Sequence, residues 1–373
     1  MPFLNSYDFQ TAFITLLGEL VENGQDVEVR GKKTKELLSC HISIANPLQL
    51  CYFVPFRKDN IFARIAETLW VLQGRNDIEW LSYYLPRAKD YSDDGNTWRA
   101  GYGKRLRRWQ LDSGDPIFGG SILDEYDQLS VAIKKLQINP YTRQAVMSIW
   151  RPDEDNKSSL DIPCNNWLHF ILRDFGITRF AFLLVAQRSA DIFWGWSNIN
   201  AFEWSILLQM MAFWTNSEVG KIDWLVTSMH MYEHHYETAN KILETYPKTY
   251  SSSDINFVPP KFSTEFDLLT SKLQKLMQVE TIFRNSVPDD VPTHEWTGDD
   301  LLDTFLHMLL IYIKLQQNSS TWLLSHLLGE MDESEYKYAA MLHVARQRKD
   351  LFTCIPESNK YIDLVKSVIL SEN

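Results

Sequence analysis

The pattern of apolar residues divides this chain into two parts near residue 250, and this division limits the folds that the chain can adopt. Before this point, helix-like stretches such as 60–73 alternate with strand-like stretches such as 180–187. After Tyr250, a segment rich in serine and proline leads into a pattern that is helical to the end. Mixed helical and extended periods are typical of an α+β domain. We therefore expect an α+β domain over residues 1–250 and a helical region over residues 251–373.

Composition and charge exclude several classes of function. The chain has 373 residues, 45% of them hydrophobic, so it can bury a large core. Its net charge of −11 would repel the phosphates of a nucleic acid, so we expect no general nucleic-acid binding. The four cysteines form no C-x-x-C pair, and the sequence shows neither a signal-like N-terminus nor an apolar run of membrane-spanning length. These features predict a cytoplasmic protein that does not cross a membrane.

A cysteine and an arginine in the middle of the chain carry a possible chemistry. Cys164 follows Pro163 at the entry to a strand-like stretch, and Arg188 lies in Gln-Arg-Ser-Ala-Asp after the next one. A thiol attacks as the thiolate, which a neighbouring cation stabilises, and an arginine can grip a phosphate through two hydrogen bonds. The pair indicates covalent chemistry on a phosphorylated substrate. Taken alone, a cysteine such as Cys164 is more often a small buried hydrophobic residue.

Seven segments follow one another in the order of a known family. The most specific is Gln-Arg-Ser-Ala-Asp-Ile-Phe-Trp-Gly at 187–195. The others lie at 65–74, 102–104, 143–150, 163–164, 200 and 229–235. Together they resemble thymidylate synthase and its nucleotide hydroxymethylase relatives over about residues 25–245. The resemblance implies a three-layer α+β fold with a large mixed sheet at a homodimer interface, to which the helical C-terminal region is added.

The resemblance also implies a reaction. A thymidylate-synthase-like transferase methylates or hydroxymethylates C5 of a pyrimidine nucleoside monophosphate such as dUMP, with 5,10-methylenetetrahydrofolate as the carbon donor and no metal. Cys164 would add to C6 of the ring and make C5 nucleophilic. Glu67 and Tyr102 would organise water and proton transfer. Asp191 would contact the folate ring.

The resemblance assigns the substrate-binding side chains by the part of the nucleotide they contact. The phosphate would be held by three residues of one subunit and one contributed by its partner, namely Arg30, Arg188, Ser189 and, from the partner, Arg143. Asn200 would read the 3–4 edge of the base, since an amide offers both a donor and an acceptor. Asn198 could take that place instead, because matching Asn200 requires one inserted residue. His230 and Tyr232 would bind the sugar hydroxyl.

The sequence departs from the family mainly where the folate should lie. Asn165 replaces the histidine that follows the catalytic cysteine, and Gln144 replaces the second of two arginines shared across the dimer. The family's pair of tryptophans is missing at 88–93, and residues 364–373 do not resemble its closing tail. We expect the half of the site that binds the nucleotide to be retained and the half that binds the folate to be altered. This pattern favours the hydroxymethylating relatives, in which water rather than hydride ends the reaction.

The sequence leaves two other functions open. The chain could bind a nucleotide as a sensor or regulator after losing folate chemistry, or it could modify C5 of another nucleotide with another donor. Single residues have structural alternatives too: Glu67 could be a paired buried acid, Asp191 a turn cap and Arg143 a surface ion-pair residue. The histidines of 230–235 have no cysteine or carboxylate at a spacing that suits zinc.

Overall fold

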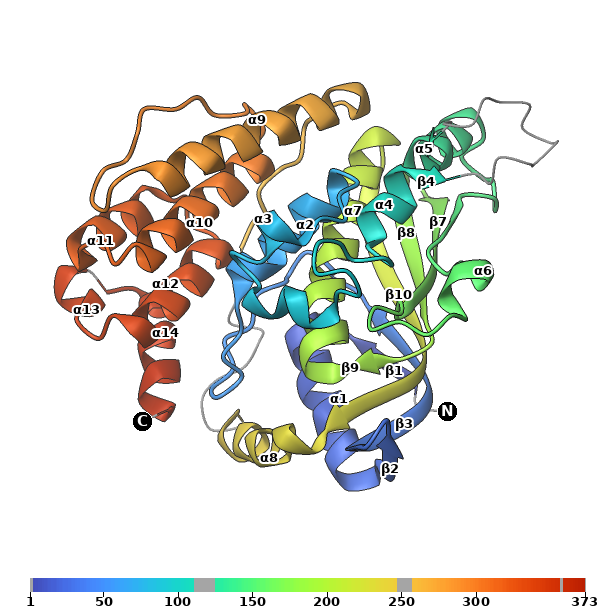
Figure 1. Ribbon diagram of the computed structural model, residues 1–373, viewed down its shortest axis with the longest axis horizontal. Helices are drawn as coiled ribbons and strands as arrows, with labels where there is room; N and C mark the ends of the chain where they lie inside the picture. The colour runs from blue at the N-terminus through green and yellow to red at the C-terminus, as the bar shows by residue number, and fades with distance from the viewer. Residues whose placement is uncertain (1–2, 111–124, 247–256, 356–357, 373) are drawn as a thin grey trace.

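The computed structural model describes residues 3–110, 125–246, 257–355 and 358–372 of the chain. An eight-stranded mixed sheet forms one side of the molecule, and helices pack against it (Figure 1). The strands of this sheet are β1 (Phe3–Ser6), β2 (Gln25–Val29), β3 (Lys32–Ile44), β6 (Val146–Ser148), β7 (Asn165–Phe175), β8 (Thr178–Gln187), β9 (Ala190–Asp191) and β10 (Glu218–Tyr232). The expected α+β fold is confirmed.

Strand β10 lies at the centre of the sheet. The spatial order is β1-β3-β10-β8-β7-β6, with β2 paired to β3 and β9 paired to β10. Strand β10 runs antiparallel to β3 and parallel to β8 and β9, which makes the sheet mixed. A short separate ladder joins β4 (Trp109–Gln110) to β5 (Glu125–Tyr126). Because β9 is short and beside β10, it brings the segment after Arg188 next to the end of the central strand.

Strand β8 carries apolar residues on both of its faces. On β8, Ala181, Leu183 and Val185 are buried on the inner face, whereas the alternate residues from Phe182 to Ala186 are only half-buried on the outer face. Helices α1 (Phe9–Asn23) and α7 (Ala201–Trp214) pack against the sheet. The helices thus bury the inner face of β8, whereas its outer apolar face is only half-buried.

The first part of the chain contains further α-helices. They are α2 (Ile61–Leu72), α3 (Ile78–Leu81), α4 (Tyr102–Arg107), α5 (Gln128–Ile138), α6 (Pro152–Asp155) and α8 (Tyr236–Thr245). Helix α2 begins at the Asn60 cap, whose side chain accepts a hydrogen bond from the Ala63 amide. The spacing of apolar residues predicts one buried face, but all twelve residues of α2 are buried. The reason is that α10 (Asp300–Gln316) and α12 (Glu335–Gln347) of the C-terminal region pack on α2 as well.

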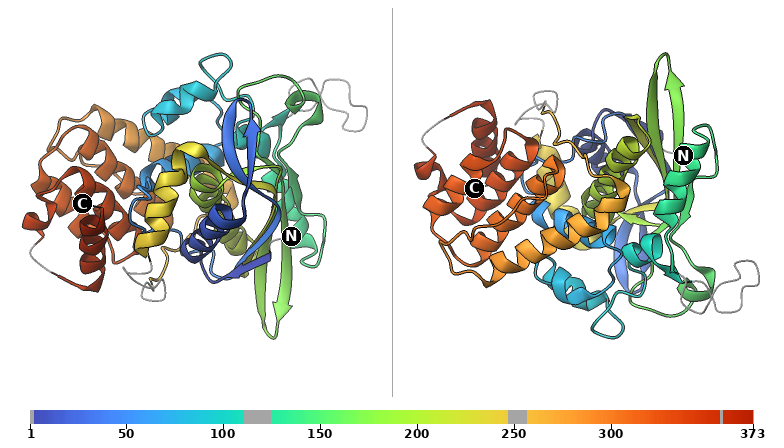
Figure 2. Two further views of the ribbon diagram at one scale, coloured as in Figure 1. Left: turned by 90° about the horizontal axis from the view of Figure 1, so that it is seen from below. Right: turned by 90° about the horizontal axis from the view of Figure 1, so that it is seen from above.

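The C-terminal region consists of helices on the side of α2 away from the sheet, as two further views show (Figure 2). They are α9 (Phe266–Asn285), α10 (Asp300–Gln316), α11 (Thr321–Glu330), α12 (Glu335–Gln347), α13 (Leu351–Cys354) and α14 (Lys360–Ser371). The helical content expected after residue 251 is present. The boundary itself, near residue 250, lies outside the described residues.

A buried carboxyl joins this helical region to the α+β part. The Glu335 side chain accepts hydrogen bonds from the Leu50 amide, at 2.9 and 3.0 Å, and from the Cys51 amide at 3.0 Å. Burial raises the pKa of Glu335 to about 7, although these amides oppose the shift. Glu372 contributes a second link, because it accepts from the Phe56 amide at 2.9 Å. The helical region is thus fixed to the loop that precedes α2.

Some helices in the described part of the chain are not α-helices. Residues Pro86–Tyr91 form the 3-10 helix η1, which starts at a proline whose fixed φ favours a helical first turn. Residues Ile192–Asn200 form a π-helix, η2, directly before α7. None of the helices in the described part of the chain combines the length and apolar character that crossing a membrane requires.

Candidate active site

Arg188 is tied to the loop that carries Cys164. Its backbone amide donates to the Cys164 carbonyl at 3.0 Å. Its side-chain Nε donates to the Pro163 carbonyl at 2.9 Å, and Nη2 donates to the Ile162 carbonyl at 3.0 Å. Cys164 itself is half-buried, neither sealed in the core nor fully in solvent. The structure therefore places the predicted nucleophile and the predicted phosphate clamp side by side.

The Ser189 hydroxyl lies between the thiol and the guanidinium. Its Oγ is 3.9 Å from Cys164 Sγ and 3.5 Å from Arg188 Nη1. Nε and Nη2 donate to main-chain carbonyls, whereas Nη1 donates to the Ser189 hydroxyl and has a second N–H that can bind a ligand. A hydroxyl and a guanidinium nitrogen so placed suit a phosphate oxygen. The ring of Trp150, 5.9 Å from the guanidinium carbon, supports the cation from one side.

Tyr102 and Asn165 flank the thiol. The Cys164 amide donates to the Tyr102 hydroxyl at 3.3 Å. Burial raises the pKa of Tyr102, and the nearby Cys164 raises it further, so this hydroxyl stays protonated. Asn165, which stands in the place of the family's histidine, is fully buried and accepts from Gln187 at 3.0 Å and from Trp204 at 3.1 Å. Asn165 therefore fixes the position of its neighbour through hydrogen bonds within the core.

Three carboxyl groups gather behind the thiol, of which the sequence pattern identifies only Glu67. Burial raises the pKa of Glu67 to about 8, with Asp161 adding to the shift. Burial also raises the pKa of Asp161 to about 6, against a hydrogen bond from the Ala100 amide at 2.7 Å. The pKa of Glu203 is raised strongly by burial and then by Glu67. Acids that keep a proton near neutral pH suit proton transfer.

The two acids missed by sequence reasoning had visible signals. Asp161 lies three residues before Cys164, at the start of the same loop. Glu203 is the one charged residue of α7, an otherwise apolar or neutral helix. A lone acid in a buried helix is uncommon unless it is paired or functional. Among the described residues Glu203 forms no ion pair. Its buried carboxyl is therefore either protonated and neutral, or placed to contact a ligand.

Glu67 should make the stability of the protein depend on pH. Its folded-state pKa of about 8 lies above the ordinary 4.5, so its favourable contribution is complete below about pH 4.5 and is lost as the pH rises through 8. We expect Glu67→Gln to raise the free energy of unfolding at pH 8 by on the order of 3 kcal/mol and to change it little at pH 4.5. Urea unfolding across this range measures the difference.

The matched control for this test is Glu79→Gln, on the exposed side of α3. That variant should follow the wild type at every pH. A Glu67→Gln protein whose stability also runs parallel to the wild type from pH 4.5 to 8 would show that the Glu67 carboxyl ionises in the folded protein as it does in the unfolded chain.

His230 and Tyr232 stand at the end of β10, next to Asp191. In the β9–β10 pairing His230 lies opposite Asp191, and the rings of His230 and Tyr232 are 5.2 Å apart. Burial is the main cause that raises the pKa of Tyr232. Asp191 and Cys164 raise this pKa further, whereas Arg30 lowers it. The end of β10 therefore brings together three of the predicted residues, His230, Tyr232 and Asp191.

The π-helix η2 explains how Asn200 reaches the site. Asp191 caps η2, accepting from the Phe193 amide at 2.8 Å and the Trp194 amide at 3.4 Å. A π-turn holds one residue more than an α-turn, which accommodates the insertion that matching Asn200 to the family requires. Asn200 is buried and accepts from Gln187 at 2.9 Å, within the network that holds Asn165.

Two predicted arginines lie at the surface. Arg30 sits in the turn between β2 and β3 with a φ of 52°, exposed and on the Tyr232 side of the molecule. Arg143 is exposed between α5 and β6, and it forms no ion pair with any residue the structure describes. Within one chain Arg143 is not brought to Cys164. Its predicted role in a partner subunit stays a prediction.

Comparison with known proteins decides the family. A family model described as thymidylate synthase matches residues 11–278. The chain belongs to the thymidylate synthase family. This confirms the resemblance seen in the ordered motifs, and the match runs beyond the α+β part into α9. Thymidylate synthases generally use methylenetetrahydrofolate and deoxyuridylate-like substrates.

Individual relatives fall into two named groups. The chain is 35% identical over 240 residues to a deoxyuridylate hydroxymethyltransferase of Bacillus phage SP01, covering 64% of this chain and 60% of that protein. A protein of the same name from Delftia phage PhiW-14 is 30% identical over 234 residues, covering 60% of each. A thymidylate synthase of Corynebacterium aurimucosum is 28% identical over 204 residues, covering 54% of this chain and 70% of that protein. The chain thus spans about three fifths of the phage relatives that it matches.

Proposed function

We propose that this protein hydroxymethylates C5 of deoxyuridine monophosphate, through a covalent bond between Cys164 and C6 of the base. One arrangement carries the proposal: a half-buried thiol, a hydroxyl 3.9 Å from it and a guanidinium tied to the same loop. This arrangement suits a substrate that has a phosphate at one end and an electrophilic ring carbon at the other. The phage relatives named for the same reaction support the choice.

The chain's own residues would act in the following order. Arg188 Nη1 and the Ser189 hydroxyl bind the phosphate and orient the base over Cys164. The thiolate adds to C6, the ring electrons move toward O4, and C5 becomes nucleophilic. Methylenetetrahydrofolate, when bound, supplies the one-carbon unit to C5. Protonated Glu67 can donate a proton toward O4 as the thiolate adds, and the Tyr102 hydroxyl lies where it can relay the proton that C5 loses. Water then adds to the transferred carbon, and the bond between Cys164 and C6 breaks to return the thiolate and release the product.

An unsatisfied polar atom favours water as the final reactant. Asn198 Oδ1, in the π-helix that carries Asn200, is buried without a hydrogen-bond partner among the described residues. Buried polar atoms of this kind are ordinarily satisfied by ordered water. A site that holds water next to the carbon being transferred suits addition of water, which yields a hydroxymethyl group, better than transfer of hydride, which yields a methyl group.

The residues present fit a folate at the far side of the site. One oxygen of Asp191 caps η2, and the other forms no hydrogen bond with a described residue, so it can accept from the N–H groups of a pterin ring. The indole of Trp194 beside it is 48% exposed and offers a flat stacking surface. We infer that these two residues take over part of the role of the tryptophans missing at 88–93.

The outer face of the sheet supports the proposal of a homodimer with a shared site. Its half-buried apolar residues on β8 form an unusual surface for a lone subunit. Packing of two such faces would bury them and bring Arg143 of the partner subunit toward the phosphate. Analytical ultracentrifugation at micromolar concentration measures the assembly, and a monomer would contradict this part of the proposal.

The products of a single incubation test the proposed function. We expect the protein, with dUMP and methylenetetrahydrofolate, to yield a nucleotide heavier by CH₂O, detected by mass spectrometry. Incubation without the folate is the control and should return unchanged dUMP. A product heavier by CH₂ would identify methylation instead. Binding of dUMP without any product would favour the sensor alternative over catalysis.

A further inference from the structure

Glu203 lies directly beneath the amide that should read the base. Asn200 Nδ2 donates to Glu203 Oε2 at 3.3 Å, and Asn200 Oδ1 accepts from Gln187 Nε2 at 2.9 Å. Gln187 is itself 1% exposed and held by Asn165, so it cannot easily turn away. The two contacts distinguish the two ends of the amide, since one neighbour only donates to it and the other accepts from it.

The contacts leave Asn200 with one free position at each end. An amide oxygen accepts two hydrogen bonds and an amide nitrogen donates two. Among the described residues, Gln187 and Glu203 each take one of them. The remaining acceptor and donor match the N3–H and O4 of uracil. Cytosine offers the opposite pattern, an acceptor at N3 and a donor at N4, and would require the amide to turn over.

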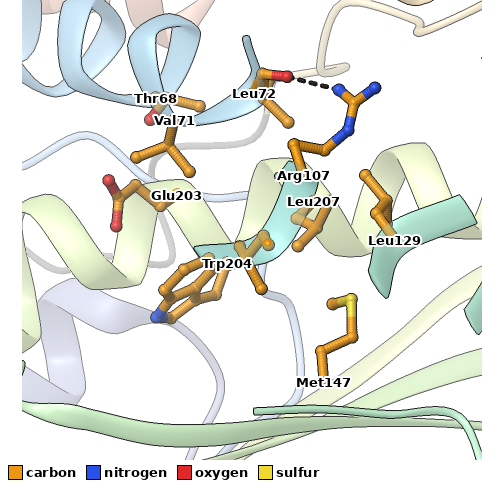
Figure 3. Close-up of a pocket in the computed structure, with 10 residues that line it drawn as sticks. Thr68, Val71, Leu72, Arg107, Leu129, Met147, Glu203, Trp204 and Leu207 are labelled. Atoms are coloured by element: carbon orange, nitrogen blue, oxygen red, sulfur yellow. Dashed lines mark hydrogen bonds between the residues drawn. The ribbon is translucent and has the colours of Figure 1, made fainter. Parts of the chain in front are cut away.

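The other oxygen of Glu203 faces a narrow cavity between α2 and α7. Figure 3 shows Glu203 extending from α7 toward the part of α2 that carries Thr68, and both residues line this cavity. Glu203 Oε1 and Thr68 Oγ1 are buried there without a partner among the described residues. Arg107 also lines the cavity, but its guanidinium is used on the Leu72 carbonyl and on Asp127. No cation among the described residues pairs with Glu203, so its neutral form fits: Oε2 accepts from Asn200 and Oε1 carries the proton toward Thr68 or a water.

We propose that Glu203 is a positioning residue for base selection, which holds the Asn200 amide in the orientation that reads uracil and rejects cytosine. This inference rests on the proposed function, since it assumes a pyrimidine nucleotide in the site. It assigns a role to an acid that the mechanism otherwise leaves without one.

The test compares the affinities of dUMP and dCMP, measured by isothermal titration calorimetry. The wild type should bind dUMP at least about tenfold more tightly than dCMP. Glu203→Met keeps the length of the side chain but cannot accept from Asn200, so the ratio of the two affinities should fall by about fivefold to tenfold. Glu203→Gln can still present a carbonyl oxygen to Asn200 and should keep the ratio within about twofold. Thr68→Val, which alters only the opposite wall of the cavity, should also keep it.

The ratio distinguishes positioning from a merely structural role. A residue needed only for folding would lower both affinities in parallel, and the ratio does not depend on the fraction of folded protein. A Glu203→Met protein that keeps the wild-type ratio overturns the role of Glu203 but leaves the proposed function intact. Glu203→Leu repeats the measurement should the methionine variant fail to fold. A wild type that prefers dCMP overturns the assigned orientation of the amide, and one that binds neither nucleotide overturns the proposed function itself.

Discussion

Replacing Cys164 by alanine should slow the release of tritium from C5-labelled dUMP by about 10⁴-fold or more. The expected loss is large because every later step depends on the bond between sulfur and C6. Alanine removes only the sulfur from a half-buried position, so the fold should persist. Tritium release into water, measured with and without methylenetetrahydrofolate, reports the effect.

Cys354→Ala is the matched control for this experiment. Cys354 is also partly exposed, but it lies in α13 of the C-terminal region. Its loss should leave the rate within about twofold of the wild type, because a surface substitution far from the site rarely matters. Full activity of the Cys164→Ala protein would rule out covalent catalysis at this residue.

Arg188→Ala should have the second largest effect, on the order of 10³-fold in kcat/KM for dUMP. The substitution removes the charge-assisted contact to the phosphate and the two side-chain hydrogen bonds to Pro163 and Ile162 that hold the Cys164 loop. Arg188→Lys keeps the charge but loses the planar fork, so it should recover only part of the rate. Steady-state kinetics with dUMP measures both variants.

Deoxyuridine, which lacks the phosphate, separates the two roles of Arg188. Its slower reaction should fall by only about tenfold in Arg188→Ala, since only the support of the loop is lost. Arg179→Ala, whose guanidinium pairs with Asp174 on the β7–β8 hairpin, is the control and should change neither substrate. An equal loss for nucleotide and nucleoside would mean that Arg188 supports the loop without binding phosphate.

Local sequence patterns predicted the helices and strands of this fold better than they predicted what packs against each of them. The apolar spacing within residues 60–73 predicted a helix, and the structure has one over Ile61–Leu72. The same spacing predicted a single buried face, because it carries no information on a second layer. Helices α10 and α12 come from residues far along the chain, and they cover the face that a solvent-exposed helix would leave open.

In the candidate site, too, the sequence predicted what depends on local order but not what depends on tertiary structure. Cys164, Arg188 and Ser189 could be placed together from their order in the sequence, and the structure places them within contact of one another. Asp161 and Glu203 escaped notice because an acid acquires a shifted pKa only through burial, which depends on the tertiary structure. Arg143 illustrates a further limit, since its predicted role depends on a second subunit.

The mass of the protein after reaction with 5-fluoro-dUMP and methylenetetrahydrofolate tests the central claim most directly. Fluorine at C5 cannot leave as a proton does, so the bond between the enzyme and C6 should persist after the carbon unit is transferred. We predict one nucleotide bound covalently per chain, located on the peptide that contains Cys164 by tandem mass spectrometry. An adduct on another residue, or product formed from dUMP with no adduct at Cys164, would contradict the account.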